Sequence, residues 1–90
     1  MQTRDPDGRT VLLTPRAWRH ILSRHEELGI NAEAILDIVA QPDRRVYGPT
    51  TGEEWFYRSG IGPSRWIRVV VHYEADSGRV TTAFPRRRFP

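Results

Sequence analysis

The chain has 90 residues, a net charge of +3, no cysteine, and 14 basic residues that are all arginine. This length fits a single domain over residues 1–90, and the absence of cysteine excludes disulfides and thiolate metal sites. No apolar run approaches the ~20 residues of a membrane span, and the N-terminus lacks the apolar core of a signal peptide. We therefore expect a cytoplasmic protein with no membrane partner.

The exclusive use of arginine has two explanations. A genome rich in G and C favours arginine codons over lysine codons whatever the protein does. Alternatively, arginine is chosen because its planar guanidinium binds phosphates in a bidentate manner and stacks on bases. The mild positive charge permits a nucleic-acid partner without requiring one.

The N-terminal third predicts a helix after a short strand. Residues 1–10 are polar and are expected to form a flexible lead-in, and residues 11–13 a short edge strand. Thr14 and Pro15 predict a helix start, because a threonine hydroxyl caps the first turn and proline needs no N–H there. The helix is predicted to run to Leu28, with the following glycine as its stop.

His25 lies in the apolar stripe of this first helix. The stripe follows the i, i+3, i+4, i+7 spacing of one buried face and consists of Trp18, Ile21, Leu22, His25 and Leu28. One interpretation is a core histidine bonded to a backbone carbonyl. The other is a titrating group at the edge of the core, with Arg24 beside it in reach of a carboxylate or a phosphate. Both interpretations stay open.

A second helix and two strands are predicted next. Asn31 is a good N-cap for the helix, and Pro42 ends it. Strands are expected at residues 43–47 and 53–58, before a long connection. With the hairpin described below, these elements predict an α+β fold in which two N-terminal helices pack on one face of a three- to four-stranded antiparallel sheet.

The strongest structural pattern is a β-hairpin over residues 66–84. Its first strand has β-branched and aromatic residues without a breaker, and residues 74–78 carry turn chemistry. Because successive strand residues point to opposite faces, the pairing register decides which side chains share a face. Pairing Glu74 with Arg79 collects the apolar side chains of both strands on one face, and we predict this register.

The opposite face of the sheet is the predicted site. A second predicted register, with Tyr57 opposite Ile67, adds alternate residues of the preceding strand to this face. The combined face carries Glu54, Phe56, Arg58, Trp66, Arg68, His72 and Thr81.

This set of side chains suits RNA cleavage without a metal ion or a cofactor. The 2′-hydroxyl attacks the neighbouring phosphate while a base takes its proton and an acid protonates the leaving oxygen; His25, His72 or Glu54 would share these roles. Arg58 and Arg68 would stabilise charge on the phosphate, and the aromatic residues would stack an unpaired base. The plainer interpretation is a solvated face with mixed charge and cross-strand aromatic packing.

Short motifs also carry a family resemblance. The segments WRHILSRHEEL, ILDIVAQPD, EEWFYR, WIRVVVHY and TTAFPRR follow one another along the chain. Together, over about residues 13–89, they resemble short bacterial and phage-associated proteins of the barnase–EndoU–colicin–RelE-like (BECR) nuclease superfamily. The resemblance implies a toxin-like ribonuclease with RNA as substrate and an antitoxin protein as partner. It also implies site residues at Arg24, His25, Arg58, Thr82 and Arg87.

The two lines of reasoning differ at Thr81 and Thr82. The predicted register turns Thr81 towards the site face and Thr82 inward, whereas the resemblance favours Thr82. A β-bulge near Ala83 would reverse the orientation, so both threonines stay candidates. The basic tail, residues 86–90, is either a phosphate-binding tail or a solvated chain end.

The sequence therefore predicts a small metal-independent endoribonuclease. The alternative is a non-catalytic RNA- or protein-binding module that uses the same arginine-rich face. A histidine metal site is not expected, because the i, i+5 separation of His20 and His25 places them on different faces of the helix.

Overall fold

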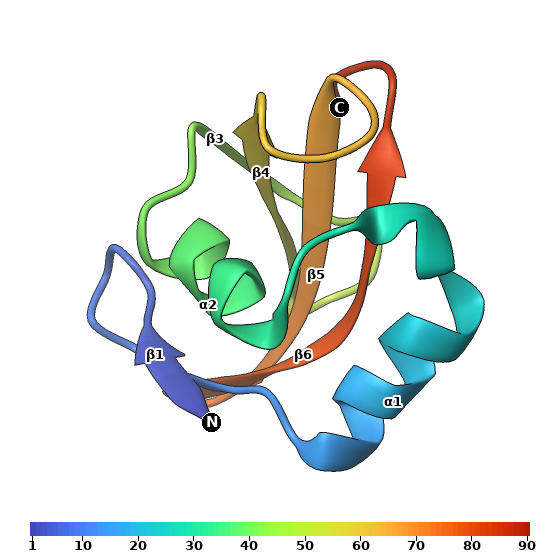
Figure 1. Ribbon diagram of the computed structural model, residues 1–90. Helices are drawn as coiled ribbons and strands as arrows, with labels where there is room; N and C mark the ends of the chain where they lie inside the picture. Colours follow the sequence, from blue (N-terminus) through green and yellow to red (C-terminus); the bar gives the residue numbers. More distant parts are fainter.

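The computed structural model describes residues 1–90, which form an α+β fold with two α-helices and a six-stranded mixed sheet (Figure 1). The strand order is β1-β2-β6-β5-β4-β3, and only the β2–β6 pair is parallel. The elements are β1 (Gln2–Arg4), β2 (Thr10–Leu12), α1 (Pro15–Arg24), the 3-10 turn η1 (Glu26–Leu28), α2 (Ala32–Ala40), β3 (Arg44–Tyr47), β4 (Glu53–Ser59), β5 (Trp66–Glu74) and β6 (Ser77–Arg86). Neither α-helix has the length and apolar character that crossing a membrane requires.

The sheet is larger than predicted. The sequence indicated three or four antiparallel strands, but β1 and β2 extend the sheet on one side and make it mixed. The segment expected to be a flexible lead-in contains β1, which pairs with β2 from Gln2 opposite Leu12 to Arg4 opposite Thr10. In turn, β2 runs parallel to β6, with Val11 opposite Gly78. The short edge strand expected at residues 11–13 is present as β2, whereas β1 was missed because a three-residue strand carries almost no periodic signal.

Both helix starts are confirmed by their caps. The Thr14 hydroxyl accepts a hydrogen bond from the Ala17 N–H at 3.1 Å, and the Asn31 side chain accepts one from the Ala34 N–H at 2.8 Å. The first helix ends earlier than predicted, at Arg24, because His25 leaves the helical conformation with φ −138°. The predicted stop, Gly29, instead ends η1 with φ +72°, a left-handed conformation that glycine adopts without strain.

The hydrophobic core lies between the helices and one face of the sheet. Figure 1 shows α2 in front of the sheet and α1 alongside β6. Ile35, Ile38 and Val39 of α2 are fully buried. They belong to the same apolar cluster as Val69 and Val71 of β5. Because alternate residues of β5 enter this core, the intervening residues lie on the opposite face, which we call the open face.

The hairpin is confirmed, but its predicted register is wrong. Glu74 pairs with Ser77 across a two-residue turn, and Arg79 lies opposite His72. Gly78 is therefore inside β6 rather than in the turn. A side chain there would collide with the ring of Tyr73, because a Cβ atom at Gly78 would lie 2.7 Å from that ring. A glycine in a strand thus marks a close side-chain approach in this chain.

The predicted register of β4 is wrong by one residue. Tyr57 lies opposite Arg68, not Ile67, so Phe56 faces the core and is fully buried. Trp55 and Tyr57 turn to the open face, contrary to the prediction. This arrangement suits their chemistry, since phenylalanine has no polar atom, whereas the indole N–H and the phenol O–H need hydrogen-bond partners.

A β-bulge decides between the two threonines. Val71 pairs with Val80 but Val70 pairs with Thr82, so Thr81 is the extra residue of β6. The bulge places Thr82 on the open face beside Val70, whereas the predicted register had turned it inward. The Thr81 hydroxyl donates instead to the Val70 carbonyl at 3.3 Å.

Candidate functional site

The open face is built from four rows of cross-strand neighbours. At one end, Trp66 lies between Ser59 and Arg86; at the other, His72 lies between Glu53 and Arg79. The two central rows, in order from β3 to β6, are Arg44-Tyr57-Arg68-Phe84 and Val46-Trp55-Val70-Thr82. Successive rows are about 7 Å apart, because each is two strand residues from the next. The face is thus rich in both arginine and aromatic side chains.

Arg68 is the central charged residue of the open face. It is only 7% exposed, and its guanidinium carbon lies 3.7 Å from the centre of the Trp55 ring. The rings of Phe84 and Tyr57 are 5.1 and 5.4 Å away, and the Arg68 Nε donates to the Tyr57 hydroxyl at 2.8 Å. A guanidinium held among three rings keeps its charge and its orientation.

No carboxylate neutralises Arg68. None of the ion pairs in the structure includes it, nor do any include Arg44 or Arg86 at the same end of the open face. Buried charges in proteins are usually paired, because removing a charge from water is costly. An unpaired, nine-tenths buried guanidinium beside the surface is therefore suited to an external anion.

His25 reaches the same place from α1. Its ring centre lies 5.4 Å from that of Phe84, whose opposite neighbour in the sheet is Arg68. The imidazole side chain is 29% exposed, and its Nδ1 lies 3.5 Å from a carboxylate oxygen of Glu27. As the C-cap of α1, His25 donates its backbone N–H to the Ile21 carbonyl. The local turn thus holds a proton-transfer group near the Phe84 ring, which the Arg68 guanidinium approaches as well.

Several other predicted residues lie around this point. Thr82 shares the open face with Arg68, one row away on β6. Arg24 is exposed in the last turn of α1, next to His25, and Arg87 is exposed just after β6. His72 shares the open face but is four residues from Arg68, about 13 Å along the strand. Its Nε2 lies 3.9 Å from a carboxylate oxygen of Glu74.

The one-residue error in β4 removes three predicted residues from the site. Phe56 is in the core, and Arg58 turns to the helix side, where its guanidinium donates to the carbonyls of Asp37 and Gln41 at the end of α2. Glu54 also faces that side, is 7% exposed, and accepts hydrogen bonds from two arginines. None of the three lies on the open face with Arg68.

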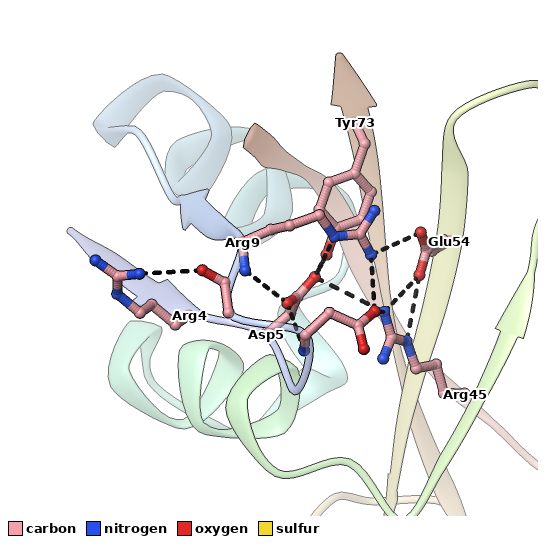
Figure 2. Close-up of polar contacts among 8 residues, drawn as sticks. Arg4, Asp5, Arg9, Arg45, Glu54 and Tyr73 are labelled. Atoms are coloured by element: carbon pink, nitrogen blue, oxygen red, sulfur yellow. Dashed lines mark hydrogen bonds and ion pairs between the residues drawn. The ribbon is translucent and has the colours of Figure 1, made fainter. Parts of the chain in front are cut away.

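Glu54 belongs to a cluster that we call the N-terminal ion network, made of Asp5, Asp7, Arg9, Arg45, Glu54 and Tyr73. Figure 2 shows its polar contacts. Arg9 bridges two carboxylates, with its Nε 2.8 Å from Asp5 and its Nη2 2.8 Å from Glu54. Arg45 contacts Glu54 at 3.0 Å and Asp7 at 2.7 Å. The network joins the β1–β2 segment to β3, β4 and β5.

Tyr73 lies over the network and binds its most buried carboxylate. Its hydroxyl donates to Asp5 at 2.7 Å, and the Arg9 guanidinium lies 3.7 Å from the centre of its ring. Burial alone would raise the pKa of Asp5, but hydrogen bonds from Tyr73 and Arg9 outweigh it and hold the pKa below its usual value. Burial, followed by the bond to Asp5, raises the pKa of Tyr73. These groups stay charged and neutral, respectively, around neutral pH.

A pocket of about 260 Å³ lies beside the network, lined by Asp7, Arg45, Val46, Tyr47 and Glu54. Its two carboxylates already bind arginines of the chain, so the pocket offers no free charge to a ligand. No three histidine, aspartate or glutamate side chains are grouped so that they could hold a metal ion.

The chain matches no protein-family model, and comparisons with curated proteins and with solved structures also found no match. The resemblance to the BECR superfamily therefore stays a prediction.

The aromatic lining of the site was missed at the sequence level. The predicted registers turned Trp55, Tyr57 and Phe84 to the apolar face, Arg86 was considered only as part of the basic tail, and Arg44 was not considered. One signal was available: Trp55 and Tyr57 carry polar groups, and the residue between them, Phe56, does not. That pattern indicates that Phe56, rather than its two neighbours, lies on the buried face of the strand.

Proposed function

We propose that the open face binds single-stranded RNA and cleaves it without a metal ion. The carrying observation is that the His25 imidazole and the Arg68 guanidinium approach the same Phe84 ring, at 5.4 and 5.1 Å. A proton-transfer group and an unpaired, pre-oriented cation thus lie together on an aromatic surface. Phosphoryl transfer at the 2′-hydroxyl of RNA needs these two groups.

In the proposed reaction a phosphate binds at Arg68 and the 2′-hydroxyl is directed towards His25. His25 takes the proton as the O2′–P bond forms and the P–O5′ bond breaks. The products are a 2′,3′-cyclic phosphate and a 5′-hydroxyl, whose proton comes from water. Arg68 stabilises the charge on the phosphorane, and the Thr82 hydroxyl, one row away, donates to a phosphate oxygen.

The resemblance to the BECR superfamily supports the same proposal. Two helices precede the antiparallel strands β3 to β6, and a histidine from α1 meets residues of the late strands, as the resemblance implies. On this view the protein is a toxin-like, phage-associated cytoplasmic nuclease that an antitoxin protein restrains. An antitoxin that covers Arg68 and His25 would block the proposed site directly.

A second candidate is a non-catalytic RNA-binding module on the same face. It is favoured by the position of Glu54 and Arg58, which the catalytic hypothesis had placed beside Arg68 and which lie on the helix side. Arginine and stacked rings without further acid–base groups suffice for binding.

The test is incubation of the purified protein with a single-stranded RNA in the presence of EDTA, followed by analysis of the product ends. We expect cyclic-phosphate ends, and a loss of about 10²-fold or more in rate for Arg68→Gln. Arg16→Gln, an exposed arginine of α1, is the matched control and should cut normally. RNA binding that weakens with salt but gives no products would favour the binding module. Equal cleavage by Arg68→Gln would disprove the proposed site.

A further inference from the structure

The segment after β6 folds back onto the basic end of the open face. The Phe89 ring lies 4.7 Å from the Tyr57 ring, nearly edge-on, and 5.5 Å from the Trp66 ring. The Arg44 guanidinium is 5.4 Å from the centre of the same ring. Phe89 is half-buried there, although the two arginines before it are exposed. The Tyr57 and Trp66 rings are themselves 6.1 Å apart and nearly perpendicular, so Phe89 lies against both of them and completes a cluster of three rings.

The surroundings of Phe89 would also suit a planar ring that is more polar than the phenyl ring. Tyr57 and Trp66 present ring faces and edges, and Arg44 adds a cation over the ring. Nucleobases bind in such settings by stacking and by cation–π contact, and these contacts do not depend on which base is present. Three arginines lie near this position, and none of them pairs with a side-chain carboxylate: Arg44, Arg68 and Arg86. The phosphates on either side of a bound base would therefore meet guanidiniums that no acidic side chain neutralises.

The folded-back segment satisfies Arg86 incompletely. The Arg86 Nη2 donates to the Pro90 carbonyl at 2.8 Å, but its Nε is buried without any partner. It is the one buried side-chain polar atom in the structure that lacks a hydrogen bond. An unmade bond at a buried donor is destabilising, and a phosphate that accepts from both nitrogens would remove this penalty.

We propose that the position against Tyr57 and Trp66 is a nucleobase-binding subsite, and that Phe89 fills it when RNA is absent. This inference rests on the proposed RNA-binding function and deepens it: the ligand is an unpaired base whose flanking phosphates reach Arg68 and Arg86. The segment 87–90 is then an intramolecular competitor, and RNA binding displaces its ring.

The test compares two short oligonucleotides that cannot be cleaved because their 2′ positions are methylated. One carries bases throughout, and the other has abasic sugars at the central positions. We expect the complete oligonucleotide to bind Phe89→Ala about tenfold more tightly than the unmodified protein. This is the factor expected if Phe89 leaves the subsite open about a tenth of the time in the unmodified protein. Trp66→Ala should weaken its binding by about 5- to 150-fold, as loss of one stacking platform does.

The abasic oligonucleotide distinguishes failure of the base subsite from failure of the proposed RNA binding. Neither substitution should change its affinity by more than about twofold, because it tests the phosphate contacts alone. If both oligonucleotides bind equally and Phe89→Ala changes neither, the subsite is disproved while phosphate binding stands. If neither binds to the unmodified protein, the proposed function fails as well. Tyr47→Ala, at an exposed tyrosine of β3, is the control and should bind like the unmodified protein.

A measurement on the unmodified protein covers the case in which Phe89→Ala fails to fold. The chain has three phenylalanines, so isotope labelling of their rings resolves Phe89 by NMR. On addition of the complete oligonucleotide, we expect the Phe89 ring signals to move to those of a solvated ring, while those of the core residue Phe56 stay unchanged. Phe89 signals that stay in place in the saturated complex would overturn the inference.

Discussion

Two groups of arginines in this protein have opposite surroundings. In the N-terminal ion network, Arg9 and Arg45 each contact two carboxylates within 3 Å. On the open face, Arg44, Arg68 and Arg86 contact no side-chain carboxylate. Arg44 is exposed, Arg86 is half-buried, and Arg68 is only 7% exposed. The open-face arginines range from exposed to buried, so the absence of a carboxylate partner, and not burial, separates the two groups.

The difference indicates what each group does. A paired guanidinium has its charge neutralised within the chain, so the network joins the β1–β2 segment to the sheet and leaves nothing for a ligand. A guanidinium with no carboxylate partner keeps its charge available to an anion. Substitutions in the network should therefore change stability, and, under the proposed function, substitutions on the open face should change RNA binding and cleavage.

The largest expected effect is on catalysis, from His25→Gln. We expect RNA cleavage to slow by about 10²-fold or more, because the base that takes the 2′ proton is lost, while RNA affinity stays the same. Single-turnover rates and binding titrations separate the two quantities. His20→Gln, on the exposed side of α1, is the matched control. A comparable loss in His72→Gln, with His25→Gln active, would place proton transfer at the other end of the open face.

Asp5→Asn should have the largest effect on stability. The substitution removes a buried negative charge that binds Arg9 and Tyr73, and we expect a loss of about 3 kcal/mol in the free energy of unfolding. Urea denaturation measures it. Asp7→Asn is the comparison, because the Asp7 side chain is 60% exposed and its loss should cost less than about 1 kcal/mol. Weaker RNA binding by folded Asp5→Asn would contradict the separation of the two groups.

Tyr73→Phe should have a smaller effect in the same direction. The ring and its packing over Gly78 are kept, but Asp5 loses one donor, so we expect a loss of about 1–2 kcal/mol. Tyr47→Phe, at a tyrosine that is 85% exposed, should be neutral. Thermal and urea denaturation of both variants test this; equal stability of the two would mean that the buried hydrogen bond contributes nothing.

The smallest expected effect is a loss of stability at acidic pH. The folded protein holds the pKa of Asp5 below the ordinary value of 3.8, so folding favours the ionised carboxylate. The stabilisation that the ionised carboxylate of Asp5 supplies is complete when the pH is above the ordinary pKa. It is lost as the pH falls through the lower pKa of Asp5 in the folded state. Urea denaturation from neutral pH down to pH 3 should show the onset of this loss, and the pH dependence should be shallower in Tyr73→Phe. Identical profiles would mean that the Tyr73 hydrogen bond does not contribute to the low pKa of Asp5, which Arg9 also lowers.

Much of the candidate site was within reach of the sequence. Arg68, His72 and Trp66 were expected on one face of the hairpin, and they share it. His25 was left open between a core and a site role; the structure places it at the edge, against Phe84. The aromatic lining was lost through the register of β4, since a slip of one residue exchanges the two faces of a strand.

The sequence by itself determined the positions of the helices and of the four longer strands. The signals are local: a hydroxyl or amide side chain caps a helix within three residues, and β-branched runs favour extended chain. Only the tertiary structure decided the registers, the bulge at Thr81, the parallel pairing of β2 with β6, and the pairing of charges. These depend on contacts between distant residues, such as the Tyr73 ring over Gly78 and its hydroxyl on Asp5. Such contacts have no counterpart in the local pattern of either partner, so they are settled only when the chain packs.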